Sequence, residues 1–333
     1  MYNRDEIARL PVGTKHDEGM GTTVPHRSHP GVPTDFRIPV PWGHLAALSW
    51  GPVDGSPVIC LHGWMDNANS FQRLVPLLPS DRRYIALDFS GHGHSSHLAK
   101  GSRYDFNNYM IEVCRAVQAL NYCQVSIIGH SMGGIIGTMF ACIFPDMVEN
   151  LILLDVYGFF PNSPEHLIKQ TRNVITNHLK LEHKHGPKVY SPEGALSRLL
   201  EANTALTEDS GRIILERGTK EVPGGVVFSR DIQVSMPYHP LFTMELSLAF
   251  LGNIGANVLT IMASESLSNR TGKDASERSL VNGFKSSLKE KYQLEIVEGN
   301  HFVHLNEPEM VSGLISSFLQ EKSTSSGSIR SRL

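Results

Sequence analysis

The segment 129–133 reads Gly-His-Ser-Met-Gly, which is the Gly-x-Ser-x-Gly spacing of a nucleophile elbow. It follows the mainly apolar run Val125–Ile128 and leads into 135–141, which can continue as a helix. A strand, a sharp turn and a helix lift the Ser131 hydroxyl above a sheet at a helix N-terminus, where a developing negative charge is stabilised. Such a turn strains the serine backbone by roughly 1–3 kcal/mol. The alternative is a glycine-rich turn with an idle serine, but the flanking pattern favours a nucleophile.

A serine nucleophile requires a base, and His301 is in a position to supply one. It follows the last predicted strand, 294–297, in the loop Gly299–Phe302. Because the active groups of open α/β sheets gather at the carboxyl ends of strands, His301 should arrive beside Ser131. His304, three residues further on, is expected to lie behind the site or to be exposed.

Two backbone N–H groups are expected to form an oxyanion hole. Met132 follows the nucleophile directly, and Trp64 lies in the His-Gly-Trp loop after the third predicted strand. Losing one such donor typically costs about 3–4 kcal/mol of transition-state stabilisation. The His62 side chain, two residues before Trp64, is expected to organise this loop through a hydrogen bond and to take no direct part in the chemistry.

The elements that position these residues alternate between strands and helices. Besides the run before the elbow, apolar segments predict strands at 36–40, 45–50, 57–61, 84–87, 151–154, 258–262 and 294–297. Helical spacing is present at 67–78, at 105–120, from the elbow to about Phe144, and at 275–291 and 308–320. This alternation requires a sheet with helices on both faces. The predicted fold class is therefore α/β, with a mainly parallel eight-stranded sheet.

Residues 158–250 interrupt the alternation. Helical patterns recur there at 165–182, 192–202 and 207–217, and no strand is predicted. We interpret this segment as a helical cap inserted into one hydrolase core, with a separate helical domain as the alternative. The predicted organisation is an N-terminal extension 1–35, ordered or not, a core made of 36–157 and 251–322, the cap 158–250 and a flexible tail 323–333.

The composition excludes several classes of protein. The chain has 333 residues, 41% of them hydrophobic, which is ample for a core, and a net charge of −3 argues against nucleic-acid binding. Its 16 histidines are scattered without metal-ligand spacing, so neither a metal nor another cofactor is expected. No apolar run is long enough to span a membrane. The cysteines are predicted to be reduced, buried thiols of an intracellular protein; they are Cys60, Cys114, Cys123 and Cys142.

Four segments together carry a family resemblance. From about residue 36 to 320 the chain resembles the serine hydrolase-like proteins of animals, and the insect members most of all. The segments are Pro41–His44, Cys60–Trp64, Asp88–Gly93 and Ile128–Ser131. The resemblance implies the α/β-hydrolase fold, with the chain order nucleophile, acid, histidine. It also implies a serine hydrolase of the carboxylesterase type, with poorly defined natural substrates.

The acid that should orient His301 is where the chain departs from the usual α/β-hydrolase pattern. Most members carry an aspartate after the seventh strand as Gly-x-x-Asp, whereas this chain reads Ala-Ser-Glu-Ser at 263–266. Asp155, after the sixth strand, is the favoured acid, because some related enzymes, including a branch of the haloalkane dehalogenases, use that position. Glu265 is the alternative, and a third possibility is that neither carboxylate reaches His301, in which case activity should be weak.

The predicted reaction is hydrolysis of a small-molecule carboxylic ester or thioester through an acyl-enzyme on Ser131. A ligand-binding pseudoenzyme of the same fold and a carbon–carbon bond hydrolase are the alternatives. A haloalkane dehalogenase or an epoxide hydrolase is disfavoured, because both use an aspartate nucleophile and this elbow carries a serine.

The last three residues, Ser331, Arg332 and Leu333, resemble the Ser-Lys-Leu address read by the peroxisomal import receptor. Arginine keeps the positive charge and the long side chain of lysine. Residues 1–20 contain no apolar segment typical of a secretory signal. We therefore predict a peroxisomal or cytoplasmic protein that is not secreted, with the import receptor as a partner.

Overall fold

The computed structural model describes residues 31–181, 186–236, 242–266 and 274–321. Its centre is an eight-stranded sheet with the order β1-β2-β4-β3-β5-β6-β9-β10. The strands are β1 (Thr34–Val40), β2 (Gly43–Trp50), β3 (Ser56–Leu61), β4 (Arg82–Leu87), β5 (Val125–His130), β6 (Val148–Leu154), β9 (Asn257–Glu265) and β10 (Tyr292–Asn300). The pairs β1–β2 and β2–β4 are antiparallel, and every later pair is parallel. The predicted mainly parallel eight-stranded sheet is confirmed.

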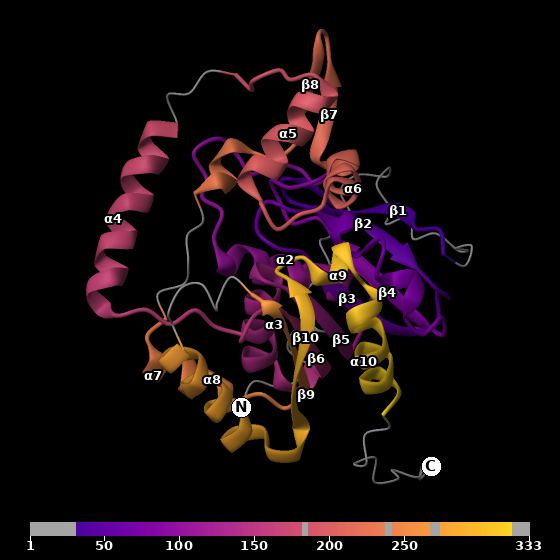
Figure 1. Cartoon of the computed structure of the whole chain (residues 1–333), viewed down its shortest axis with the longest axis vertical. Helices are drawn as coiled ribbons and strands as arrows, with labels where there is room; N and C mark the ends of the chain where they lie inside the picture. Colours follow the sequence, from indigo (N-terminus) through magenta and orange to yellow (C-terminus); the bar gives the residue numbers. More distant parts are fainter. Residues whose placement is uncertain (1–30, 182–185, 237–241, 267–273, 322–333) are drawn as a thin grey trace.

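Helices cover both faces of this sheet (Figure 1). One apolar cluster joins the sheet to α2 (Phe106–Ala119), α3 (Met132–Ile143) and α8 (Asp274–Leu288). A second cluster lies on the other face and includes α10 (Glu309–Gln320), which follows the single turn α9 (Val303–Asn306). Since both faces are covered, strands such as β5 are buried along their whole length and are mainly apolar, without a polar face.

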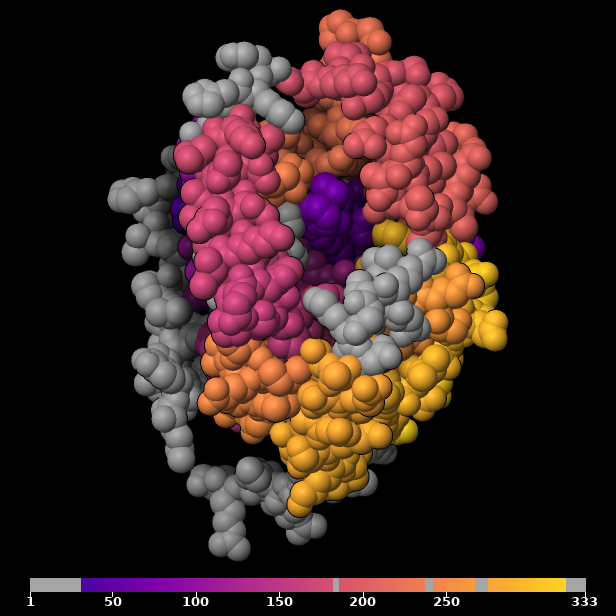
Figure 2. Space-filling model, turned by 60° about the vertical axis from the view of Figure 1, so that its left-hand side comes forward, coloured from indigo at the N-terminus to yellow at the C-terminus, as the bar shows by residue number. Residues whose placement is uncertain are grey.

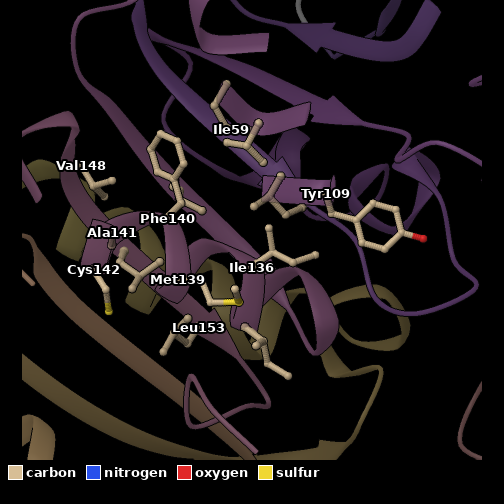
Figure 3. Packing of buried hydrophobic residues seen from close by; sticks show 14 of the residues in the cluster. Ile59, Tyr109, Ile136, Met139, Phe140, Ala141, Cys142, Val148 and Leu153 are labelled. Carbon is tan, nitrogen blue, oxygen red and sulfur yellow. The ribbon is translucent and has the colours of Figure 1, made fainter. Parts of the chain in front are cut away.

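The helix that follows the elbow, α3, lies in the middle of the first cluster. All but one of its twelve residues are buried, as expected of a helix that is apolar on every side. Figure 3 shows Met139 and Phe140 of this helix in the same packed cluster as Ile59 of β3 and Leu153 of β6. The elbow is thus anchored between a buried strand and a buried helix.

The segment 158–250 holds α4 (Pro164–Leu181), α5 (Pro192–Ala202), α6 (Glu208–Gly218) and α7 (Met244–Leu251). The helices predicted at 165–182, 192–202 and 207–217 are confirmed. The expectation that this segment contains no strand is wrong, because β7 (Thr219–Val222) and β8 (Gly225–Phe228) form an antiparallel hairpin. Its two-residue turn is Pro-Gly, with Gly224 at φ 89°, the left-handed conformation that glycine adopts without strain. Figure 1 shows α5, α6 and the hairpin on the side of the sheet where the parallel strands end.

Two smaller expectations also need correction. The helical spacing at 67–78 yields two short 3₁₀ helices, Ala68–Phe71 and Val75–Leu77, because Pro76 lacks the N–H that a continuous helix needs. Cys123 is exposed and Cys114 is only partly buried, although all four cysteines are free thiols as predicted. None of the helices within the described residues has both the length and the hydropathy that crossing a bilayer requires.

Candidate active site

Ser131 lies at the sharp turn between β5 and α3, as the elbow motif predicts. Its backbone has φ 49° and ψ −114°, a strained conformation for a residue with a side chain. The turn is tight enough that a Cβ atom on Gly133 would lie 2.0 Å from the carbonyl oxygen of Leu61. A Cβ atom on Gly129 would lie 2.6 Å from the carbonyl oxygen of Gly133. The glycines of the motif therefore permit the close approach of strand and helix that exposes the serine.

Asp155 and His301 come together from the ends of two different strands. Asp155 follows β6 and has a positive φ of 51°, and His301 follows β10. The His301 Nδ1 atom lies 2.6 Å from Asp155 Oδ2. Asp155 also accepts hydrogen bonds from the Ala263 N–H at 3.0 Å and from the Ser266 hydroxyl at 2.9 Å. This set of contacts holds the carboxylate and the imidazole in one orientation.

The environment of Asp155 favours its ionised form. Burial alone would raise the pKa of the Asp155 carboxyl, because a charge is poorly solvated there. The hydrogen bond and charge of His301, together with the hydrogen bonds from Ala263 and Ser266, outweigh burial and lower that pKa below its ordinary value. A carboxylate is thus present to accept the Nδ1–H of His301, which leaves Nε2 as the free acceptor of the neutral ring.

Glu265, the alternative acid, lies elsewhere. It ends β9, is exposed, and is paired across the sheet with Asn300. Within the residues that the structure describes, no hydrogen bond or ion pair joins Glu265 to His301. The geometry therefore brings Asp155, and not Glu265, to the histidine.

Ser131, Asp155 and His301 share the wall of one cavity of about 100 Å³. Most of the remaining wall is apolar and comes from α3, from the segment after β6 and from α8; it consists of Ile135, Val156, Tyr157, Phe159, Phe160, Pro161 and Leu280. Glu277 and Ser276 of α8 and Ser266 supply further polar groups. Figure 2 shows this molecule hollowed between α4 on one side and the salmon-coloured segment with α5 and α6 on the other.

The loop after β3 is held rigidly beside the elbow. The His62 ring, fully buried, makes a 2.7 Å hydrogen bond through Nδ1 to the Gly63 carbonyl and accepts the Phe89 N–H at Nε2 over 3.1 Å. The expected loop-organising hydrogen bond of His62 is confirmed. The Trp64 indole donates to the Val234 carbonyl at 2.8 Å. Among the described residues, the backbone N–H groups of Trp64 and Met132 have no acceptor, so both are available to an oxyanion.

Comparisons with known proteins identify the family of this chain. A family model described as "alpha/beta hydrolase fold" matches residues 56–184. Serine hydrolase-like protein 2 of Homo sapiens is 42% identical over 299 residues, which cover 87% of this chain and 95% of the human protein. A probable serine hydrolase of Drosophila melanogaster is 33% identical over 293 residues, covering 86% of this chain and 88% of the fly protein. The chain belongs to the serine hydrolase-like family of α/β hydrolases.

The fold has a counterpart among solved structures. The crystal structure of a hypothetical protein from Pseudomonas aeruginosa PAO1 superposes with a TM-score of 0.76 at 29% identity. The superposition covers 86% of this chain and 97% of the bacterial protein. The α/β-hydrolase fold of this serine hydrolase-like chain is therefore shown by sequence and by structure.

Two histidines beside the site of this serine hydrolase-like protein had no predicted contact. His130 lies within the elbow motif, and its Nε2 atom is 2.9 Å from the His301 carbonyl oxygen. The His304 ring is fully buried at 4.0 Å from the His130 ring, so it lies behind the site and is not exposed. Burial, followed by the nearby charges of His130 and His301, holds the pKa of His304 well below its ordinary value. Burial also lowers the pKa of His130, so the neutral form is favoured for both rings, which pack behind His301. The position of His130 inside the motif was the only sequence signal for this contact.

A buried ion pair joins the segment 158–250 to the core of this family member. Arg217 of α6 donates to Asp88 Oδ2 from Nε at 3.1 Å and from Nη2 at 2.7 Å, and it also contacts Asp35. Asp88 is fully buried and accepts the backbone N–H groups of Ala68 and His94 as well. Since Asp88 follows β4, this pair attaches α6 to the carboxyl edge of the sheet, next to the loop that holds Trp64.

Proposed function

We propose that this chain is a carboxylesterase-type serine hydrolase, with Ser131 as nucleophile, His301 as base and Asp155 as the orienting acid. The observation that carries the proposal is the 2.6 Å contact between Asp155 Oδ2 and His301 Nδ1 in the cavity that Ser131 also lines. The substrate is a carboxylic ester or a thioester. The positive φ of Ser131 supports the same role, because strain of this kind persists only where the surroundings hold it.

In the proposed mechanism, His301 Nε2 takes the proton from the Ser131 hydroxyl as its oxygen attacks the carbonyl carbon. The tetrahedral oxyanion accepts hydrogen bonds from the Trp64 and Met132 N–H groups. His301 then gives its proton to the departing alcohol or thiol, which leaves an acyl group on Ser131. A water molecule, deprotonated by His301, attacks this ester, and its breakdown releases the acid and restores the hydroxyl. Asp155 stabilises the imidazolium formed in both halves.

The apolar wall of the cavity favours a substrate that carries an apolar group on one side of the scissile bond. Phe159, Leu280 and their neighbours offer hydrocarbon surface directly beside Ser131. Burial of such surface contributes roughly 25 cal/mol per Å² of apolar area. The segment 158–250 is proposed to act as a cap over this cavity. Its first residues include Phe159, Phe160 and Pro161, which form part of the cavity wall. No cofactor is required by this chemistry.

Two other functions fit the same fold, a ligand-binding pseudoenzyme and a carbon–carbon bond hydrolase. The contact between Asp155 and His301 weakens the first and does not distinguish the second from an esterase. A ligand-binding pseudoenzyme was an alternative because the usual aspartate position holds Ser266. The contact between Asp155 and His301 supports a working base and weakens that alternative. A carbon–carbon bond hydrolase would use the same serine and histidine, so substrate profiling has to separate it from an esterase.

Labelling with a fluorophosphonate probe tests the proposal. The native protein should form a covalent adduct, and Ser131→Ala should form none. As a matched control, Ser264→Ala removes an exposed serine on β9 and should label like the native protein. Hydrolysis of p-nitrophenyl esters and of acyl-CoA thioesters with graded chain lengths would then define the substrate. Absence of labelling in folded native protein, or retained ester hydrolysis by Ser131→Ala, would refute the mechanism.

The tripeptide Ser331–Leu333 lies outside the described residues, and its role as a peroxisomal address stays a prediction. A fluorescent protein fused to the N-terminus should give punctate peroxisomal fluorescence, and the same fusion without Leu333 should be diffuse. A diffuse pattern for the intact fusion would exclude import through this tail.

A further inference from the structure

Helix α4 presents apolar side chains to the outside of the molecule. Ile168 is 64% exposed, Leu179 54% and Ile175 47%. At 100° per residue these three side chains fall within about 40° of one another on the helix surface. The buried residues of α4, Leu167 and Leu181, lie on another side of the helix. The helix therefore has an outer apolar stripe in addition to the face that packs inward. Figure 1 shows α4 standing at one side of the molecule.

The charges of α4 lie next to this outer stripe. Arg172 shares its face, and Lys169 and Lys180 follow along one edge at about 100–120° from Ile168. Glu165 is the only acidic residue among the eighteen of α4, so three basic side chains and one acidic one give the helix a charge of +2. The chain as a whole carries −3. A basic, apolar surface on an otherwise acidic protein calls for a partner that is apolar and anionic.

The outer face of α4 also lies close in sequence to the candidate site. Phe160 and Pro161 line the cavity that holds Ser131 and His301, and α4 begins three residues later at Pro164. Figure 2 shows α4 forming one border of the hollow in the surface of the molecule. A surface bound by α4 would therefore lie beside this hollow, and only residues 162 and 163 separate Pro161 in the cavity wall from the first residue of the helix.

We propose that the outer face of α4, made of Ile168, Arg172, Ile175 and Leu179 with Lys169 and Lys180 at its edge, docks the protein on an anionic phospholipid surface. Helices that lie in the interface plane combine an apolar face with lysines and arginines that contact anionic headgroups. Long basic side chains beside the apolar stripe can extend toward those headgroups. A second copy of the chain is a poorer partner, since a two-fold contact would face these cations with their own counterparts.

Co-sedimentation with phosphatidylcholine vesicles, with and without phosphatidylserine, tests this proposal on the full-length protein. The apolar variant combines Ile168→Ser, Ile175→Ser and Leu179→Ser. Its control is Ile296→Ser, which changes a 70% exposed isoleucine on β10. The charge variant combines Lys169→Gln, Arg172→Gln and Lys180→Gln, and its control is Lys220→Gln at an exposed lysine of β7. The thermal unfolding midpoint and near-ultraviolet circular dichroism of each variant establish that it is folded.

The native protein should bind vesicles that contain phosphatidylserine, and less so at high salt. Each neutralised base should lower the partition coefficient about fivefold, because a basic residue near an anionic surface contributes about 1 kcal/mol. The partition coefficient of the apolar variant should fall by more than about a hundredfold. Both controls should bind like the native protein. The readout needs no turnover, so Ser131→Ala protein should bind equally and the result is independent of the proposed reaction.

Three results would overturn the proposal. The first is no binding by the native protein to phosphatidylserine vesicles. The second is equal binding by the native protein and by the folded charge variant, which carries only exposed substitutions. The third is concentration-dependent self-association, measured by sedimentation, that disappears in the apolar variant, because this would make the outer face of α4 a contact between copies of the chain.

Discussion

Replacing Asp155 by asparagine changes the chemistry of the site with little change in shape. The Asp155 carboxylate accepts three hydrogen bonds, from Ala263, Ser266 and His301. An asparagine side chain has one acceptor oxygen and one NH₂ donor. If the oxygen keeps the bond from the Ala263 N–H, the NH₂ group faces His301 Nδ1. That nitrogen must then accept a hydrogen bond, and the ring proton moves to Nε2.

A proton on His301 Nε2 blocks the atom that should take the proton from Ser131. The corresponding substitution in the serine-protease triad lowers kcat about 10⁴-fold through the wrong tautomer. We expect a loss of the same order for Asp155→Asn, which equals about 5.4 kcal/mol in the activation free energy at 1.36 kcal/mol per tenfold. Asparagine also lacks the negative charge that stabilises the His301 imidazolium in the transition state, and this loss acts in the same direction.

Steady-state hydrolysis of the best p-nitrophenyl ester measures this effect. Glu265→Gln is the matched control, because it changes an exposed carboxylate one residue from Ser266, and it should leave kcat unchanged. Ser266→Ala removes one hydrogen bond and keeps the carboxylate, so a loss of about tenfold at most is expected. Nitrogen NMR of the His301 ring would report the tautomer directly. A native-like kcat in Asp155→Asn, or an inactive Glu265→Gln enzyme, would show that the acid is not Asp155.

Three further predictions follow from single contacts. Ser131→Ala and His301→Ala should each remove nearly all turnover, and the double variant should be scarcely worse than either, as kinetics on the three proteins would establish. Arg217→Ala should destabilise the protein by about 3–5 kcal/mol in urea unfolding, because it leaves the Asp88 charge buried without a counter-charge. Burial raises the pKa of Glu112 to about 7, so the folded state holds that proton more tightly than the unfolded chain does. The stability that the protonated Glu112 side chain contributes is complete below the ordinary glutamate pKa and is lost as the pH rises through about 7. The Glu112→Gln variant should therefore gain stability relative to the native protein between about pH 5 and pH 8.

The core elements were predictable because their signals are local. Buried parallel strands such as β5 read as apolar runs, and the bounds of α5 are marked by Ser191, whose side chain caps the helix, and by Pro192 at its first position. The hairpin β7–β8 was missed because its strands have only four residues, and β7 (Thr-Lys-Glu-Val) has no apolar alternation. Only the Pro-Gly turn at 223–224 indicated it.

The candidate site was predictable in part for a related reason. Ser131 lies in a motif, and His301 follows a strand, so both have sequence signals that do not depend on distant residues. Which carboxylate contacts His301 depends on how the chain turns after β6, where Asp155 lies, and at the end of β9, where Glu265 lies. Asp155 points to the histidine because its backbone leaves β6 with a positive φ, and no residue type at that position announces this conformation. The sequence alone therefore did not decide whether Asp155 or Glu265 contacts His301, because the answer depends on the conformation of these two turns.

The serine at 266 then has a physical interpretation. It occupies the position where most α/β hydrolases carry the acid, and its hydroxyl donates a 2.9 Å hydrogen bond to the same Asp155 oxygen that contacts His301. A second carboxylate at that position would face the first at short range, and like charges so close raise the pKa of one partner. A hydroxyl at 266 instead helps to keep Asp155 ionised. The departure at Ser266 and the proposed acid at Asp155 therefore fit one arrangement, in which the carboxylate follows β6 and the Ser266 hydroxyl donates a hydrogen bond to it.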